Sequence, residues 1–154
     1  MRAVWARHQN ILLWLWRSCI FLAALAWMGL IFQLSSLSQE EASAPLEAPV
    51  IAWLGVARSY LAHLVLYGVL ATMVQMNFWA WSNAGMYRLR WALLAAALAS
   101  FYGVTDEYHQ SLVPGRVASI IDMGVNATGA AITAAGLWLL ALASKRLYPP
   151  ESAS

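Results

Sequence analysis

Long apolar stretches separated by polar connections dominate the chain. A helix needs about 20 mostly apolar residues to cross the hydrocarbon core of a bilayer. Residues 18–34, 59–81 and 117–144 meet this requirement, the last with a single charge, Asp122. A further uncharged stretch, residues 91–105, is shorter. The pattern predicts several membrane-spanning helices and no sheet.

The short stretch at 91–105 needs an explanation. Fifteen residues rise only about 22 Å as a helix, which is less than the ~30 Å thickness of the hydrocarbon core. We therefore expect this helix to continue through the polar residues 105–110. The predicted fold is an all-α integral membrane four-helix bundle with helices at about 18–34, 59–81, 88–112 and 119–144, preceded by a cytoplasmic segment 1–17 and followed by a cytoplasmic tail 145–154.

Composition and charge agree with a membrane protein. Hydrophobic residues make up 62% of the chain and charged residues only 10%, which excludes an ordinary soluble domain. A net charge of +2 is too small for a nucleic-acid binder. Seven of the nine Lys and Arg residues fall on the side of the two termini, and this asymmetry predicts cytoplasmic termini.

The ionisable residues near membrane depth gather at the predicted extracytoplasmic end. On the third helix, Asp106 lies three and four residues before His109 and Gln110, so these side chains share a face. Charges at membrane depth are costly and usually mark a functional site. The candidate site comprises Asp106, Glu107, His109 and Gln110 on the third helix, His63 and Tyr67 on the second, Arg116 in the turn, and Asp122 and Asn126 on the fourth.

Structural roles are the alternative for several of these residues. Ser119 and Asp122 have capping-box spacing, so Asp122 could serve as a helix cap. Arg116 could pin the turn by pairing with Glu107 or Asp122. A hydrogen bond from His63 to a neighbouring helix would contribute only ~0.6 kcal/mol on average in a membrane. So small a gain would hardly justify burying several charges for stability alone. This comparison favours a functional role for the group as a whole.

Other polar or small residues predict packing rather than chemistry. Gly129, Thr133 and Gly136 continue the face of Asn126 and give the fourth helix a narrow flank, which favours close helix packing. Gln75, near the cytoplasmic end of the second span, is expected at the membrane interface.

The polar motifs resemble those of the VanZ-like family, which is named after a teicoplanin-resistance protein. Residues 105–110 and 114–116 match its T-D-E-x-x-Q and P-G-R patterns. Asp122, Asn126 and Gly129 match D-x-x-x-N-x-x-G at the start of the last helix.

The first half of the chain carries the same resemblance. Residues 32–36 match the family's F-x-L-S-S, and His63 with Tyr67 matches H-x-x-x-Y. The likeness thus covers residues 32–129. One departure is Tyr60, which stands where the family often has Lys; Arg58 is the nearest cation.

The resemblance implies a role in the bacterial envelope and, in some members, glycopeptide (teicoplanin) resistance. Together with the spans and charges, it predicts a multi-pass protein of the bacterial cytoplasmic membrane with its site on the extracytoplasmic side. It implies no established reaction. One hypothesis is an enzyme acting on an envelope lipid or lipid-linked cell-wall precursor. Glu107 or Asp106 beside His109 would be the general base, and His63 and Tyr67 would protonate a leaving group. Arg116, Gln110, Asp122 and Asn126 would hold the ligand.

Two other hypotheses use the same residues. A non-catalytic binder would hold a lipid head group or precursor and would not need a proton-transfer carboxylate. A proton-coupled carrier is disfavoured because no ionisable residue lies midway along a span. A metal on Asp106, Glu107, His109 and Asp122 would match no strong ligand spacing, so neither a metal nor a cofactor is assigned.

Overall fold

A computed structural model describes residues 2–38, 41, 54, 57–82 and 85–147. This part of the chain contains four helices and no strand, which confirms the predicted all-α fold. The helices are α1 (Arg2–Ser35), α4 (Ala57–Trp81), α5 (Leu89–Gln110) and α6 (Ile120–Leu147). Three segments are long and apolar enough to cross a membrane, namely Asn10–Ser35, Ala57–Trp81 and Ile120–Leu147.

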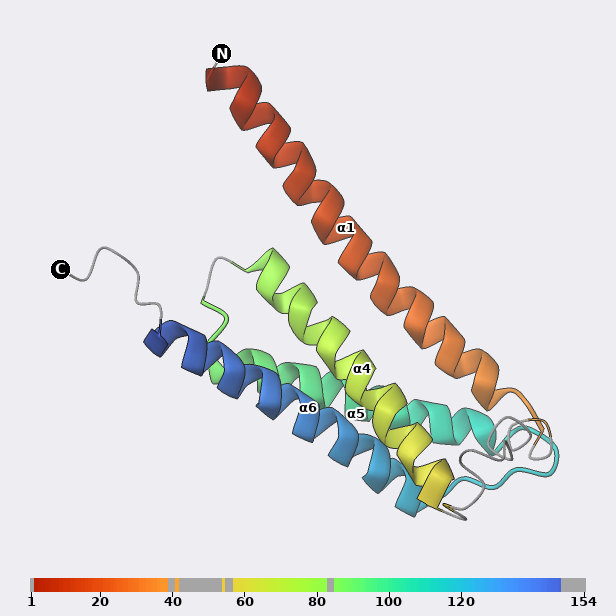
Figure 1. Ribbon diagram of the computed structural model, residues 1–154. Helices are drawn as coiled ribbons and strands as arrows, with labels where there is room; N and C mark the ends of the chain where they lie inside the picture. The colour runs from red at the N-terminus through yellow and green to blue at the C-terminus, as the bar shows by residue number, and fades with distance from the viewer. Residues whose placement is uncertain (1, 39–40, 42–53, 55–56, 83–84, 148–154) are drawn as a thin grey trace.

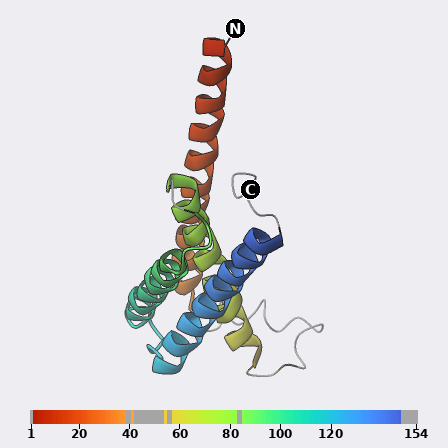
Figure 2. The same ribbon diagram turned by 90° about the vertical axis from the view of Figure 1, so that its left-hand side faces the viewer.

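The helices α4, α5 and α6 pack together, and α1 lies against α4 and α5 (Figure 1). The N-terminal part of α1 extends past the other three helices (Figure 2). This helix begins at Arg2, well before the expected span at 18–34, because residues 2–17 contain neither Gly nor Pro to stop it. Of the expected tail at 145–154, residues 148–154 lie outside the described residues.

The ends of α1 and α5 and the beginnings of α4 and α6 meet at one end of the bundle, which we call the polar end (Figure 1). Residues 105–110 are helical, as the length argument required. The chain then turns at Val113–Arg116, where the Arg116 backbone N–H donates to the Val113 carbonyl over 3.1 Å. Gly115 has a φ of +80°, which residues with a side chain rarely adopt.

The opposite end is rich in aromatic and basic side chains. Arg17 on α1 donates from Nε to the carbonyl of Ala80 over 2.8 Å. Its guanidinium lies 5.9 Å from the ring centre of Trp14 and 5.5 Å from that of Trp81, within cation–π range. The contact ties α1 to the end of α4, and similar pairs join Arg90 to Trp91 and Lys145 to Tyr87.

The core combines bulky side chains such as Tyr67 and Leu70 with small residues that let the helices approach closely. The buried side chains include Ala95 and Ala99 on α5 and Ala130 and Ala134 on α6. The helices α4 and α6 come close together at Gly129, where a Cβ atom would lie 2.5 Å from the carbonyl oxygen of Leu64. The predicted small-residue flank thus lies at a helix contact at this position.

The flank does not extend to Gly136. A Cβ atom built there meets no other atom within 4 Å in the described structure. The two glycines therefore form a matched pair on one helix, one in tight contact and one open.

We expect Gly129→Ala to destabilise the protein by about 1–3 kcal/mol, because the Leu64 backbone must move to admit the methyl group. Gly136→Ala should leave stability unchanged or raise it by up to ~1 kcal/mol, the gain in helix propensity. Thermal unfolding in detergent measures both. Equal midpoints for the two variants would contradict the close approach of α4 and α6.

Candidate functional site

Glu107 is the most deeply buried charged residue at the polar end, with an exposed fraction of 0%. Its Oε2 accepts a hydrogen bond of 3.0 Å from the backbone N–H of Ser119, at the beginning of α6. Its Oε1 is buried and has no hydrogen-bond partner among the described residues. The positive end of the α6 helix dipole thus faces Glu107, and only one of the two carboxylate oxygens is hydrogen-bonded among the described residues.

Ser119 caps α6 as predicted, since its Oγ accepts the backbone N–H of Asp122 over 3.1 Å. A capping box would also place the Asp122 carboxylate on the Ser119 N–H. In the structure Glu107 accepts that hydrogen bond instead. The carboxylate of Asp122 lies within electrostatic range of Glu107.

Other buried polar atoms near Glu107 also lack partners in the described part of the chain. They are the hydroxyl of Tyr67, which also lies within electrostatic range of Asp106, and the Nδ2 of Asn126. Both side chains meet at Gly103, one turn before Glu107, where a Cβ atom would lie 3.1 Å from the Tyr67 ring and 3.3 Å from Asn126 Nδ2. Any larger residue than Gly103 would displace them.

His63 completes this group. Its Nδ1 lies 2.9 Å from Oδ1 of Asn126. An amide oxygen only accepts, so Nδ1 carries the proton, and Nε2 of the neutral ring is then an acceptor. His63 also lies within electrostatic range of Glu107. We call Glu107, Tyr67, Asn126 and His63 the inner cluster.

A second group of polar residues is hydrogen-bonded in a chain. Ser35 donates from Oγ to Oδ1 of Asp106 over 2.5 Å, and Gln110 donates from Nε2 to Oδ2 over 3.0 Å. Arg116 donates to Oε1 of Gln110 and, over 3.4 Å, to the carbonyl of Leu37. This network joins α1 to α5 and to the turn, and Arg116 holds the turn through neutral acceptors.

His109 lies against α1. Its Nε2 is 3.0 Å from Oγ of Ser36, and its ring stacks on Phe32 with 4.3 Å between ring centres. Because the Ser36 hydroxyl donates its proton to the Phe32 carbonyl, it accepts from His109. The expected pairing of His109 with a carboxylate therefore does not appear among these contacts.

The predicted site residues on α5 thus form two groups, which face different helices. Asp106 and His109 turn toward α1, while Glu107 turns toward α6. Within the described ranges, no group of three or more His, Cys, Asp or Glu is placed to hold a metal ion.

Two features of these polar contacts were not predicted. Ser35 is buried and hydrogen-bonded to Asp106. The feature of the sequence that could have indicated this contact is its place in the S-S pair at the end of the first span. Gln75 was expected at the membrane interface but has an exposed fraction of 0%, and its amide atoms are unpartnered among the described residues. It follows Tyr67 by eight residues and so shares the buried face of α4.

The fold and the polar end define a small multi-pass membrane protein with a buried polar cluster at one end of a helical bundle. The family model described as VanZ/LLP1 matches residues 19–142. The chain belongs to this family, which confirms the resemblance inferred from its motifs. No curated protein and no solved structure matches the chain.

We expect Glu107→Gln to melt at the same temperature as the wild type or higher. The Gln carbonyl can still accept the Ser119 N–H, and a buried charge is removed. Asp106→Asn should lose about 1–3 kcal/mol, because Asp106 accepts hydrogen bonds from Ser35 and Gln110 on two oxygens and an amide has only one oxygen to accept them. Gln110 cannot rotate to compensate without turning its own amide toward Arg116.

Thermal unfolding in detergent compares these two variants directly, because each neutralises one of two adjacent carboxylates. A far lower midpoint for Glu107→Gln than for Asp106→Asn would show that Glu107 is the structural member of the pair.

Proposed function

We propose that this protein is a membrane-embedded enzyme that acts on the head group of an envelope lipid or lipid-linked cell-wall precursor. The observation that carries the proposal is the free Oε1 of buried Glu107 beside the unpartnered Tyr67 hydroxyl and Asn126 amide. Each buried polar group without a partner costs about 1–3 kcal/mol. Three such groups in one place favour a site for a polar ligand over a stabilising network.

The chemistry follows from the atoms that are free. Glu107 Oε1 would take the proton of an attacking water or hydroxyl group as general base. The Tyr67 hydroxyl would donate a proton to the leaving oxygen, with His63 Nε2 as a further proton carrier. Asn126 Nδ2 would donate a hydrogen bond to a head-group oxygen.

The hydrogen-bonded network would form the rim of this site. The guanidinium of Arg116 has five N–H donors, and its contacts to Gln110 and Leu37 leave others for a phosphate or carboxylate. Asp106 holds Gln110 in place for this purpose. Asp122 would bind the ligand or tune Glu107 from the side of α6.

We further propose that the polar end faces the extracytoplasmic side of the bacterial cytoplasmic membrane. The basic residues Arg17, Arg90 and Lys145 lie at the opposite end, as the positive-inside rule expects for cytoplasmic termini. A change in a lipid-linked precursor on that side would alter the access of glycopeptides to their target. This would supply a link to teicoplanin resistance.

The test compares the lipids of bacterial cells that express the wild type, Glu107→Gln or Glu41→Gln. Glu41 is an exposed carboxylate bonded to Ser38, so its variant matches the charge change away from the cluster. We expect mass spectrometry to find a lipid altered by the wild type and Glu41→Gln. Its conversion should fall by about 10²–10⁴ in Glu107→Gln, the usual contribution of a general base.

The same experiment identifies a binder. In that case no lipid is converted in any strain, and one lipid copurifies equally with the wild type and Glu107→Gln. This outcome, or equal conversion by all three chains, would contradict the proposed role of Glu107.

A further inference from the structure

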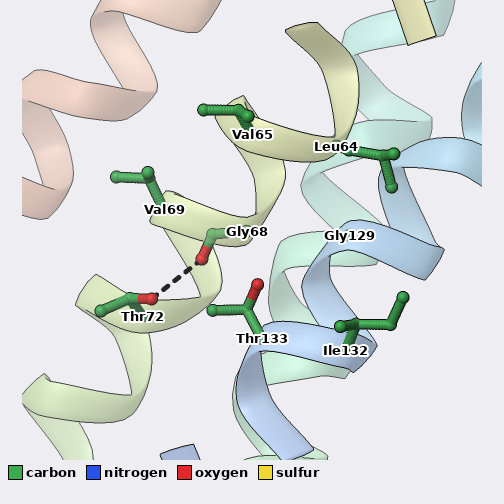
Figure 3. Close-up of a pocket in the computed structure, with 8 residues that line it drawn as sticks. All are labelled: Leu64, Val65, Gly68, Val69, Thr72, Gly129, Ile132 and Thr133. Carbon is green, nitrogen blue, oxygen red and sulfur yellow. Dashed lines mark hydrogen bonds between the residues drawn. The ribbon is translucent and has the colours of Figure 1, made fainter. Parts of the chain in front are cut away.

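An apolar groove opens between α4 and α6 on the surface of the bundle (Figure 3). Its volume is about 380 Å³, within the ~300–1,000 Å³ range of ligand sites. The walls include Leu64, Val65, Gly68 and Val69 of α4 and Gly129 and Ile132 of α6. Both helices are long and apolar enough to span a membrane, so the groove lies at the depth of hydrocarbon chains.

Small residues form the floor of the groove and bulky ones its rim. Gly68 and Gly129 are buried in the contact between the two helices, whereas Val65 and Ile132 are 60% and 66% exposed. The Thr72 hydroxyl donates to the Gly68 carbonyl over 3.0 Å, so it is satisfied within its own helix. Apart from the Thr133 hydroxyl, the surface offered to an occupant is therefore apolar.

The groove lies next to the inner cluster along α4 and α6, although no residue of that cluster lines it. On α6, the residues Asp122, Asn126, Gly129 and Thr133 follow each other at helical spacing on one face. On α4, Leu64 directly follows His63, whose Nδ1 is bonded to Asn126. A molecule that enters the groove at Gly129 thus lies one helical turn from the polar groups.

We propose that the groove holds one hydrocarbon chain of the lipid whose head group the inner cluster binds. The inference rests on the proposed function and adds to it that the substrate carries a long apolar chain. The chain would lie along α4 and α6 from Gly129 toward the opposite end of the bundle.

A hydrocarbon chain fits the groove better than another transmembrane helix does. Close helix packing needs small residues that are accessible on the surface. Here Gly68 and Gly129 are already used in the contact between α4 and α6, and Val65 and Ile132 would hold a helix away. A flexible single chain reaches the floor between these side chains.

The test uses the full-length protein in vesicles of phosphatidylethanolamine and phosphatidylglycerol, with a phosphatidylglycerol that bears a photoactivatable diazirine in its acyl chain. Cross-links are located by mass spectrometry. We expect them to concentrate in the wild type on residues 64–72 and 129–133. In Ile132→Trp the larger side chain takes up part of the groove. It should reduce this labelling about tenfold, the loss expected when two methylene groups of the hydrocarbon chain are displaced from the groove.

Two further variants guard against misfolding and non-specific effects. Val65→Trp fills the groove from the α4 side and should act in the same way. Leu140→Trp makes the same change on α6 at a site that is 68% exposed and outside the groove, and it should label as the wild type does.

Labelling spread evenly over all exposed apolar faces would overturn the proposal, since it would mean ordinary contact with bulk lipid. Groove segments that alone escape labelling would overturn it too, because another helix would then cover them. Glu107→Gln distinguishes this proposal from the proposed function. It should retain groove labelling while losing conversion of the lipid head group, and unchanged conversion would overturn the catalytic role but not the chain site.

Discussion

The hydrogen bond from the Ser119 backbone to Glu107 joins the end of α5 to the beginning of α6, and the arrangement of the polar end depends on it. It fixes where α6 starts and therefore where Asn126 stands relative to His63. It also engages only one carboxylate oxygen and leaves the other unpartnered in the described interior. The same carboxylate thus has a structural oxygen, Oε2, and the oxygen that we propose takes part in chemistry, Oε1.

The two adjacent carboxylates differ in their hydrogen-bond partners, and we propose that one serves stability and the other function. Asp106 is satisfied on both oxygens by Ser35 and Gln110, and this network joins α1 to the rest of the bundle. Glu107, the next residue, faces α6 because successive helical positions point about 100° apart. Sites that work usually keep unpaired groups that stability alone would remove, and the inner cluster has this character while its neighbour does not.

Sequence reasoning predicted the helices well because hydrophobic length is a local property of the chain. It also extended α5 into polar residues 105–110, since a shorter helix could not cross the hydrocarbon. It could not assign partners between helices. The Ser119 cap was predicted, but its acceptor on α5 was not, because a capping motif describes only neighbouring residues. Spacing likewise grouped His109 with the carboxylates, whereas the packing of α1 on α5 draws its ring to Phe32 and Ser36.

The contact of α4 with α6 connects packing to chemistry. The absence of a side chain at Gly129 lets the Leu64 backbone come close, and the adjacent His63 then reaches Asn126 one turn away. The same approach leaves the groove between the rims of Val65 and Ile132. Anything that enters the groove therefore touches the two helices whose separation sets the His63–Asn126 bond. The groove and the His63–Asn126 hydrogen bond are in this way features of one helix pair.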